Sequence, residues 1–220
     1  MSTALPAARR PVLRGWLHMA AAPVAMVGTI VLWQSTTTLP GRVTTSIFGV
    51  CLVGLYVASS IYHVPTWRPR ARAVLARVDG AMIVLKIVGT FTPIAYHALD
   101  GSWRTASLTV AWIIAVVAIG LIVSPLRVPR WVRGASAIAI GWLAVVPFIQ
   151  IANALPAAGS GLILLGGLLY TLGALAYITR WPDPFPRWFG YHEIFHLLVV
   201  AASTMHWLAI WRYVLPGGSS

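Results

Sequence analysis

Charged residues are scarce in this 220-residue chain: they make up 9% of the sequence, and only 4 of them are Asp or Glu. Soluble domains carry about a quarter of charged residues. Together with 59% hydrophobic residues and a mean hydropathy of +0.81, this scarcity excludes a soluble globular protein. Cys51 is the only cysteine, which excludes a disulfide framework and a thiolate metal site.

Long apolar stretches fill most of the chain. Seven stretches of nearly spanning length lie at about residues 16–37, 43–64, 78–97, 105–125, 134–155, 158–179 and 188–211. A spanning helix takes ~20 residues, so seven take ~140 and leave no room for a second folded domain. We therefore predict an all-α membrane protein in which residues 1–220 form a single domain of seven transmembrane helices. The last stretch has no lysine, which excludes a retinal Schiff base of the rhodopsin type.

The basic residues lie mostly between the apolar stretches, where they set orientation and do not indicate nucleic-acid binding. Twelve arginines fall on the N-terminal side of the predicted bundle: Arg9, Arg10, Arg14, Arg68, Arg70, Arg72, Arg77, Arg127, Arg130, Arg133, Arg180 and Arg187. Three fall on the opposite side: Arg42, Arg104 and Arg212. This bias predicts a plasma-membrane protein with a cytoplasmic N-terminus and a C-terminus outside the cell.

Four ionisable residues are predicted to share one depth in the membrane. His63 ends the second stretch, Asp79 begins the third, and the seventh begins with His192 and His196. In a bundle of alternating helices these three ends meet on the cytoplasmic side. Ionisable residues inside membrane helices are costly and usually face a cavity or a partner, so these four are the first functional candidates.

The spacing of His192 and His196 places two imidazoles on one helix face, and His63 supplies a third. Three histidine nitrogens leave one tetrahedral position open, as in a catalytic zinc site. We therefore predict that these three histidines bind Zn²⁺. Glu193 lies ~100° around the helix from His192 and is not expected to be a ligand. The alternative is a set of interfacial or core histidines bonded to backbone carbonyls.

Asp79 and Ser59 are the candidate catalytic residues. Asp79 could accept a hydrogen bond from a zinc-bound water or from a ligand histidine. Ser59 precedes His63 by four residues and lies on the same face, where its hydroxyl could support the ligands or stabilise a developing oxyanion. The alternatives are a carboxylate at a helix start, paired with Arg77 or Arg72, and a serine bonded to its own helix.

The remaining titratable residues have weaker claims. His206 lies ten residues beyond His196, roughly 15 Å deeper, so we predict an interhelical or cavity-lining role. His18 is interpreted as an interfacial histidine, although it could approach the site, and His97 is expected to be solvated. Lys86 lies deeper on the helix face of the candidate aspartate, where it either faces a cavity and holds an acyl carboxylate or carbonyl, or snorkels.

Several motifs together resemble the hemolysin III family, the bacterial branch of the progestin and adipoQ receptor family that includes the adiponectin receptors. They are Ser59-x-x-x-His63, Asp79-Gly80 through Gly89-Thr90-Phe91-Thr92-Pro93, and His192-Glu193-Ile194-Phe195-His196 through His206. The likeness covers nearly the whole chain. It implies a zinc ion held by His63, His192 and His196, with Asp79 contacting the metal-bound water.

The resemblance also implies membership of a wider set of proposed membrane hydrolases that includes alkaline ceramidases. The family's name comes from haemolytic activity ascribed to some members. The chain departs from the family in two places: Arg14-Gly15-Trp16-Leu17 replaces the acidic and Asn-Ser residues common before the histidine at position 18, and Lys86 stands where an apolar residue is usual.

The leading hypothesis is a zinc-dependent membrane hydrolase that acts on a lipid amide or ester, with the lipid entering an intramembrane cavity from the bilayer. Zinc would activate the attacking water and polarise the carbonyl, and Asp79 would pass the proton to the leaving group. The rival is a membrane-active or receptor-like protein whose zinc is structural. A fourth protein ligand would favour the rival.

Overall fold

The structure is a computed structural model that describes residues 11–124 and 129–215. Helices make up most of these ranges, and the β pairing found within them is an isolated bridge between Phe185 and Phe189. The all-α prediction is therefore confirmed. Arg9, Arg10 and Arg127, which contribute to the predicted orientation, lie outside the described residues.

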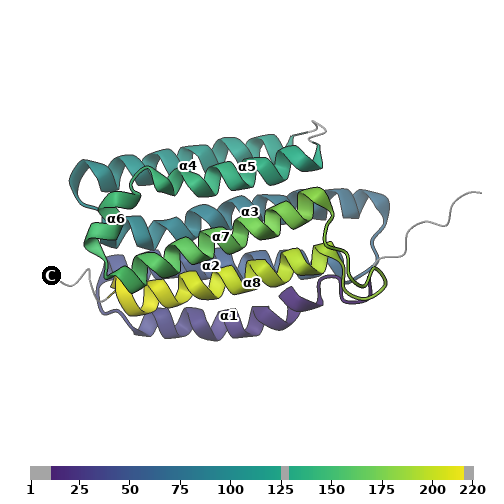
Figure 1. Cartoon of the computed structure of the whole chain (residues 1–220), viewed down its shortest axis with the longest axis horizontal. Helices are drawn as coiled ribbons and strands as arrows, with labels where there is room; N and C mark the ends of the chain where they lie inside the picture. The colour runs from purple at the N-terminus through teal and green to yellow at the C-terminus, as the bar shows by residue number, and fades with distance from the viewer. Residues whose placement is uncertain (1–10, 125–128, 216–220) are drawn as a thin grey trace, which may run out of the picture.

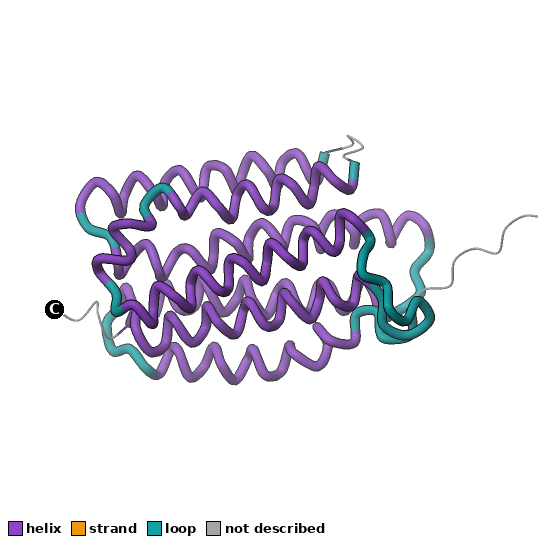
Figure 2. The backbone as a smooth tube through the Cα atoms, in the orientation of Figure 1, coloured by secondary structure: helices purple, strands orange, loops and turns teal. Residues whose placement is uncertain are grey.

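The helices run side by side along the long axis of the molecule (Figure 1), and the loops gather at its two ends (Figure 2). In chain order they are α1 (Trp16–Gln34), α2 (Leu39–His63), α3 (Pro69–Ala98), α4 (Gly101–Val123), α5 (Arg130–Trp142), η1 (Leu143–Val145), α6 (Phe148–Ala154), α7 (Ala157–Thr179), α8 (Tyr191–Ala209) and η2 (Ile210–Val214). α1 packs against both α2 and α8, and α8 packs against α7. The first and last helices therefore meet, and the end of α2 lies near the start of α8.

Two helix starts follow directly from local sequence. Thr38 caps α2, because its Oγ1 accepts a hydrogen bond of 3.2 Å from the backbone N–H of Gly41. α3 begins at Pro69, well before the predicted residue 78. Proline suits the first helical turn, where its missing N–H costs nothing. The apolar pattern did not reveal this first part of α3 because it is rich in arginine.

The predicted single helix over residues 134–155 is wrong. The chain is broken there into α5 and α6, which are bent by 53° relative to each other. Pro147 lies at the break, directly before α6. A proline has no N–H to donate and its ring clashes with the preceding turn, so it ends or kinks a helix. The segment therefore forms two helical parts joined at a bend.

Five helices are long and apolar enough to cross a membrane, namely α1, α2, α4, α7 and α8 with η2, and the broken pair gives a sixth if it counts as one span. α3 is not among them. α4 is the least buried of the five, since Ala115 is the one buried residue over its fully described length. Apolar side chains on an outer helix face are what a lipid environment requires.

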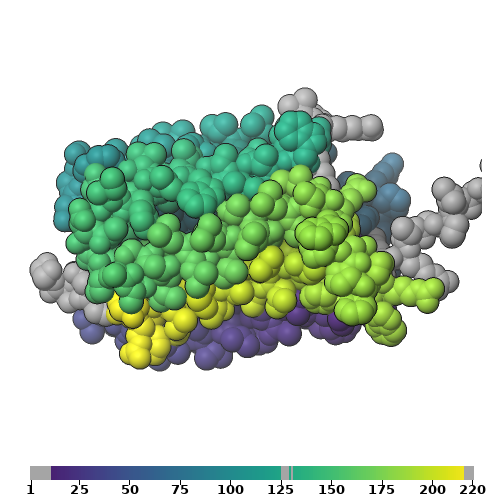
Figure 3. Space-filling view, viewed as in Figure 1, coloured from purple at the N-terminus to yellow at the C-terminus, as the bar shows by residue number. Residues whose placement is uncertain are grey.

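The interior is closely packed around side chains such as Leu32, Phe48 and Ile94. Side chains of α5, α6 and α7 cover one face of the bundle (Figure 3). Small residues allow close approach between membrane helices. A Cβ added to Gly166 would lie 2.5 Å from Nε2 of His206, so α7 and α8 meet at this glycine.

Candidate metal centre

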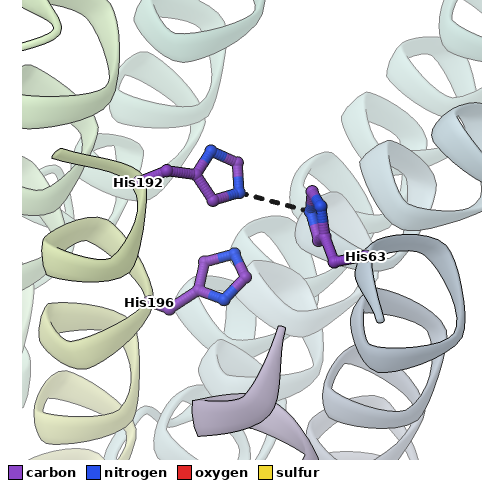
Figure 4. A group of neighbouring side chains, drawn as sticks. All are labelled: His63, His192 and His196. Carbon is purple, nitrogen blue, oxygen red and sulfur yellow. Dashed lines mark hydrogen bonds between the residues drawn. The ribbon is translucent and has the colours of Figure 1, made fainter. Parts of the chain in front are cut away.

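Three buried histidines from two helices converge at one end of the bundle. His63 is the last residue of α2, and His192 and His196 lie in the first turns of α8. One ligand atom from each lies within 4.8 Å of the others. Nε2 of His192 lies 3.3 Å from Nε2 of His63, and the ring of His196 lies beside them (Figure 4).

This donor set fits a single metal ion. Histidine nitrogens bind zinc at ~2.0–2.1 Å in a tetrahedron, so two such nitrogens lie about 3.4 Å apart. The separation of 3.3 Å between His63 and His192 matches that value. Imidazole ligands suit zinc, copper, iron and nickel. The three predicted ligands can therefore hold one transition metal.

A carboxylate lies beside the histidines without belonging to their group. Oδ2 of Asp79 lies 3.7 Å from Nε2 of His63. The hydroxyl of Ser59, one turn before His63 on α2, hydrogen-bonds the Asp79 side chain. The candidate catalytic residues are therefore adjacent to each other and to the candidate ligand of α2. This arrangement would allow Asp79 to hold a proton close to a metal ion bound by the histidines.

The alternative partners considered for Asp79 were Arg72 and Arg77. The described residues show no ion pair between Asp79 and Arg72 or Arg77. The guanidinium of Arg72 lies over the ring of Tyr62, 5.2 Å from its centroid. Asp79 also lies in the interior of α3, which starts at Pro69, so a role as the carboxylate of the helix start is wrong.

His18 lies against the centre, and its interpretation as an interfacial histidine is wrong. Its side chain is only 2% exposed. The ring stacks on that of His196, with centroids 4.0 Å apart and planes 2° from parallel, and the centroid of the Tyr56 ring lies 4.9 Å from that of His18. His18 is absent from the group of converging nitrogens. It therefore fixes the plane of a ligand ring.

A partly buried ion pair ties the N-terminal segment to the start of α8. Nε of Arg14 donates to Oε1 of Glu193 at 3.0 Å, and Oε2 of the same glutamate accepts from the backbone N–H of Gly190 at 2.8 Å. Two backbone hydrogen bonds, from Val12 and Leu13 to the loop before α8, extend the contact. This pair fixes the helix turn that carries the first α8 histidine. Sequence reasoning missed it, since the partners are 179 residues apart.

Gly15 allows this segment to approach His63. Its φ is 87°, in the left-handed region, and an added Cβ would lie 2.7 Å from Cβ of His63. We expect Gly15→Ala to lower the free energy of unfolding by ~1–3 kcal/mol, because it combines backbone strain with a clash, and to weaken metal binding. Melting temperature and metal content per chain would measure both effects.

Gly101 provides the matched control for this substitution. Its φ is 51°, but an added Cβ would meet nothing within 4 Å. Gly101→Ala therefore introduces strain without a clash and should leave metal content unchanged. Equal metal content in the two variants would contradict the proposed support of His63 by Gly15.

The other titratable residues lie away from the three nitrogens. A ring nitrogen of His206 donates to the carbonyl of Ile163 on α7 at 3.0 Å, which is the predicted interhelical role. His97 is partly buried and lies 3.2 Å from the hydroxyl of Thr44, so its expected solvation is incomplete. Lys86 is only 2% exposed and does not snorkel.

Comparison with known proteins identifies close sequence relationships. A model of the family described as "Haemolysin-III related" matches residues 7–207. "Hemolysin-3" of Bacillus cereus is 30% identical over 177 residues, which cover 79% of this chain and 76% of that protein.

Eukaryotic proteins also match. The "Adiponectin receptor protein" of Drosophila melanogaster is 26% identical over 216 residues, covering 89% of this chain and 48% of the receptor. A "Heptahelical transmembrane protein" of Oryza sativa subsp. japonica is 28% identical over 195 residues, covering 78% of this chain and 85% of that protein.

Proposed function

The chain belongs to the haemolysin-III-related family of multi-pass membrane proteins, and from that premise we propose that it is a zinc-dependent hydrolase of a lipid amide or ester. One observation carries the proposal: three buried histidine nitrogens converge, while the nearby carboxylate of Asp79 lies outside their group. Catalytic zinc sites use three protein ligands and keep the fourth position open. The lipid enters from the bilayer.

We propose a topology of seven spans with a cytoplasmic N-terminus. The five apolar helices, the broken pair α5–α6 and α3 together supply seven crossings. The N-terminal side of these crossings is richer in arginine, including Arg14, Arg68 and Arg180. Short basic loops remain on the cytoplasmic side, and an odd number of spans places the C-terminus outside.

A reporter fused to the C-terminus tests this topology. We expect a reporter that needs the outer side of the membrane to be active, and one that needs the cytoplasm to be inactive, in intact cells. The same reporters fused to the N-terminus should give the reverse result and serve as the control. Activity of the cytoplasmic reporter at the C-terminus would refute either the number of spans or their direction.

The chain's residues have separate roles in this chemistry. His63, His192 and His196 would hold the ion, which when bound supplies a Lewis acid for the carbonyl and lowers the pKa of a water. Asp79 takes a proton from the attacking water onto its carboxylate and returns it to the leaving amine or alcohol. Ser59 orients that carboxylate through its hydroxyl.

The rival function is a membrane-active or receptor-like protein in which the metal only ties α2 to α8. The name of the Bacillus cereus relative, "Hemolysin-3", supports this second function. A structural site would be closed by a fourth protein ligand. The described residues place no fourth histidine, cysteine or carboxylate in the converging group, which supports the hydrolase.

Product analysis in heavy-oxygen water tests the proposed reaction. Purified zinc-loaded protein would be incubated with a panel of long-chain lipid amides and esters in water labelled with ¹⁸O. Hydrolysis adds water across the bond between carbonyl carbon and leaving group, so we expect one ¹⁸O atom in the released carboxylic acid. Acid released without the label would exclude hydrolysis.

A further inference from the structure

A second group of polar side chains lies two helical turns from the metal centre. On three helices, a residue of this group is seven positions from a residue of the centre: Tyr56 and His63 on α2, Lys86 and Asp79 on α3, and Ser203 and His196 on α8. Seven residues of α-helix span about 10 Å and return to nearly the same face. All three residues lie on the same side of the centre, because α2 runs toward the centre while α3 and α8 run away from it.

Lys86 is the middle of this group. Its Nζ donates to the hydroxyl of Thr90 at 2.6 Å and to the hydroxyl of Tyr170, on α7, at 2.7 Å. The rings of Phe48 and Tyr170 also face the ammonium group, at 5.4 and 5.1 Å. Hydroxyl oxygens and aromatic faces both favour a cation. The surroundings of Lys86 therefore suit its charged form.

The hydroxyl groups extend from Lys86 toward α8 and α2. The hydroxyl of Tyr170 lies 2.7 Å from that of Ser203, which hydrogen-bonds Tyr56. An ammonium group can only donate hydrogen bonds, so the hydroxyl oxygen of Tyr170 accepts one from Lys86, and the Tyr170 O–H is left to donate to Ser203. We call Tyr56, Lys86, Thr90, Tyr170 and Ser203 the second polar layer.

The second polar layer contains no negative charge to balance Lys86. All four acidic side chains of the sequence lie in the described residues, and each has a different partner: Asp79 with His63, Asp100 with Arg104, Asp183 with the backbone N–H of Tyr191, and Glu193 with Arg14. A buried cation inside a membrane is costly unless an opposite charge is paired with it. An anion from outside the chain would supply this charge.

We propose that the second polar layer binds the carboxylate of a single-chain lipid through Lys86. An ammonium group has three N–H donors, and Thr90 and Tyr170 occupy two of them among the described residues. An apolar tail allows a carboxylate to enter the bilayer, which a small hydrophilic anion does not readily do. The inference rests on the proposed function only for the source of the ligand, because hydrolysis of a lipid amide or ester releases such an acid in the same bundle.

Lys86 is the only lysine in the sequence, so a single isotope label reports on this site. Zinc-loaded protein with ¹⁵N-labelled lysine, in a non-ionic detergent, would be titrated with laurate while its Nζ signal is recorded. We expect laurate to shift the signal saturably. Dodecanol, which has the same chain without the charge, should not shift it, and neither should chloride or acetate.

Variants test the role of the charge. Lys86→Met keeps the length and removes the charge, and we expect it to weaken laurate binding at least tenfold by calorimetry. Tyr170→Phe should weaken binding less. Arg104→Gln removes a partly exposed cation at the start of α4, and should leave laurate affinity unchanged. If Lys86→Met does not fold, the titration of the native labelled chain still shows whether laurate binds at Lys86.

Three results would overturn the proposal: no shift with laurate, an equal shift with dodecanol, or unchanged laurate affinity in Lys86→Met. A shift with chloride or acetate equal to that with laurate would assign the layer to a small anion and reject the lipid. None of these measurements requires turnover. If the chain binds laurate at Lys86 but hydrolyses no lipid, this inference therefore stands and the proposed function is rejected.

Discussion

Asp79→Asn is expected to leave zinc bound and to reduce lipid-amide hydrolysis by ~10²-fold or more. Asparagine has nearly the shape of aspartate but is a far weaker base, so it cannot take a proton from the attacking water. The carboxylate lies 3.7 Å from His63 and outside the group of three nitrogens, so its replacement should spare the metal. Zinc content, melting temperature and turnover would be compared in the two proteins.

Ser59→Ala is the matched control for this variant. It removes the hydroxyl that hydrogen-bonds Asp79 but keeps the carboxylate, so turnover should fall by less than in Asp79→Asn. If Asp79→Asn retains both full zinc content and full turnover, the aspartate is not the catalytic base, although the metal site remains.

Replacement of His63, His192 or His196 by alanine is expected to abolish stable zinc binding. Loss of groups that only support metal ligands costs ~10–100-fold in affinity, so loss of a direct ligand should cost at least ~100-fold. The native chain should carry about one zinc, and each variant much less after dialysis. The melting temperature should also fall, because the ion joins α2 to α8 and its binding energy stabilises the fold.

His206→Ala separates loss of a ligand from general damage to α8. His206 lies on the same helix, buried against α7 and bonded to Ile163, but apart from the converging nitrogens. We expect this variant to lose some stability and keep its zinc. Full zinc content in His192→Ala and His196→Ala, or loss of zinc in His206→Ala, would refute the ligand assignment.

Hydropathy located the helical segments of the chain, but it did not give the residues at which each helix begins, ends or breaks. It reports where a helix is apolar, so it omitted the arginine-rich start of α3 at Pro69. It also read through Pro147, because residues on both sides of this proline are apolar. The break between α5 and α6 depends on backbone geometry, which a window of apolar residues does not record.

Helical spacing predicted which polar residues share a depth, and the structure brings His63, His192 and His196 together. Spacing gives the depth and face of a residue on its own helix, but not the neighbour that covers that face. The stacking of His18 on His196 and the pairing of Arg14 with Glu193 both depend on how α1 and its preceding segment pack against α8. Contacts between the two ends of a chain are not encoded in any local pattern.

The most direct test of the proposed function is the rate of lipid-amide hydrolysis measured against zinc content per chain. Native protein would be stripped of metal and reloaded in steps, with Asp79→Asn treated in parallel. We predict that the native rate rises in proportion to bound zinc up to about one ion per chain, while the variant stays ~10²-fold slower even when fully loaded. A native rate that does not change with zinc, or no hydrolysis by folded and fully loaded protein, would contradict the account.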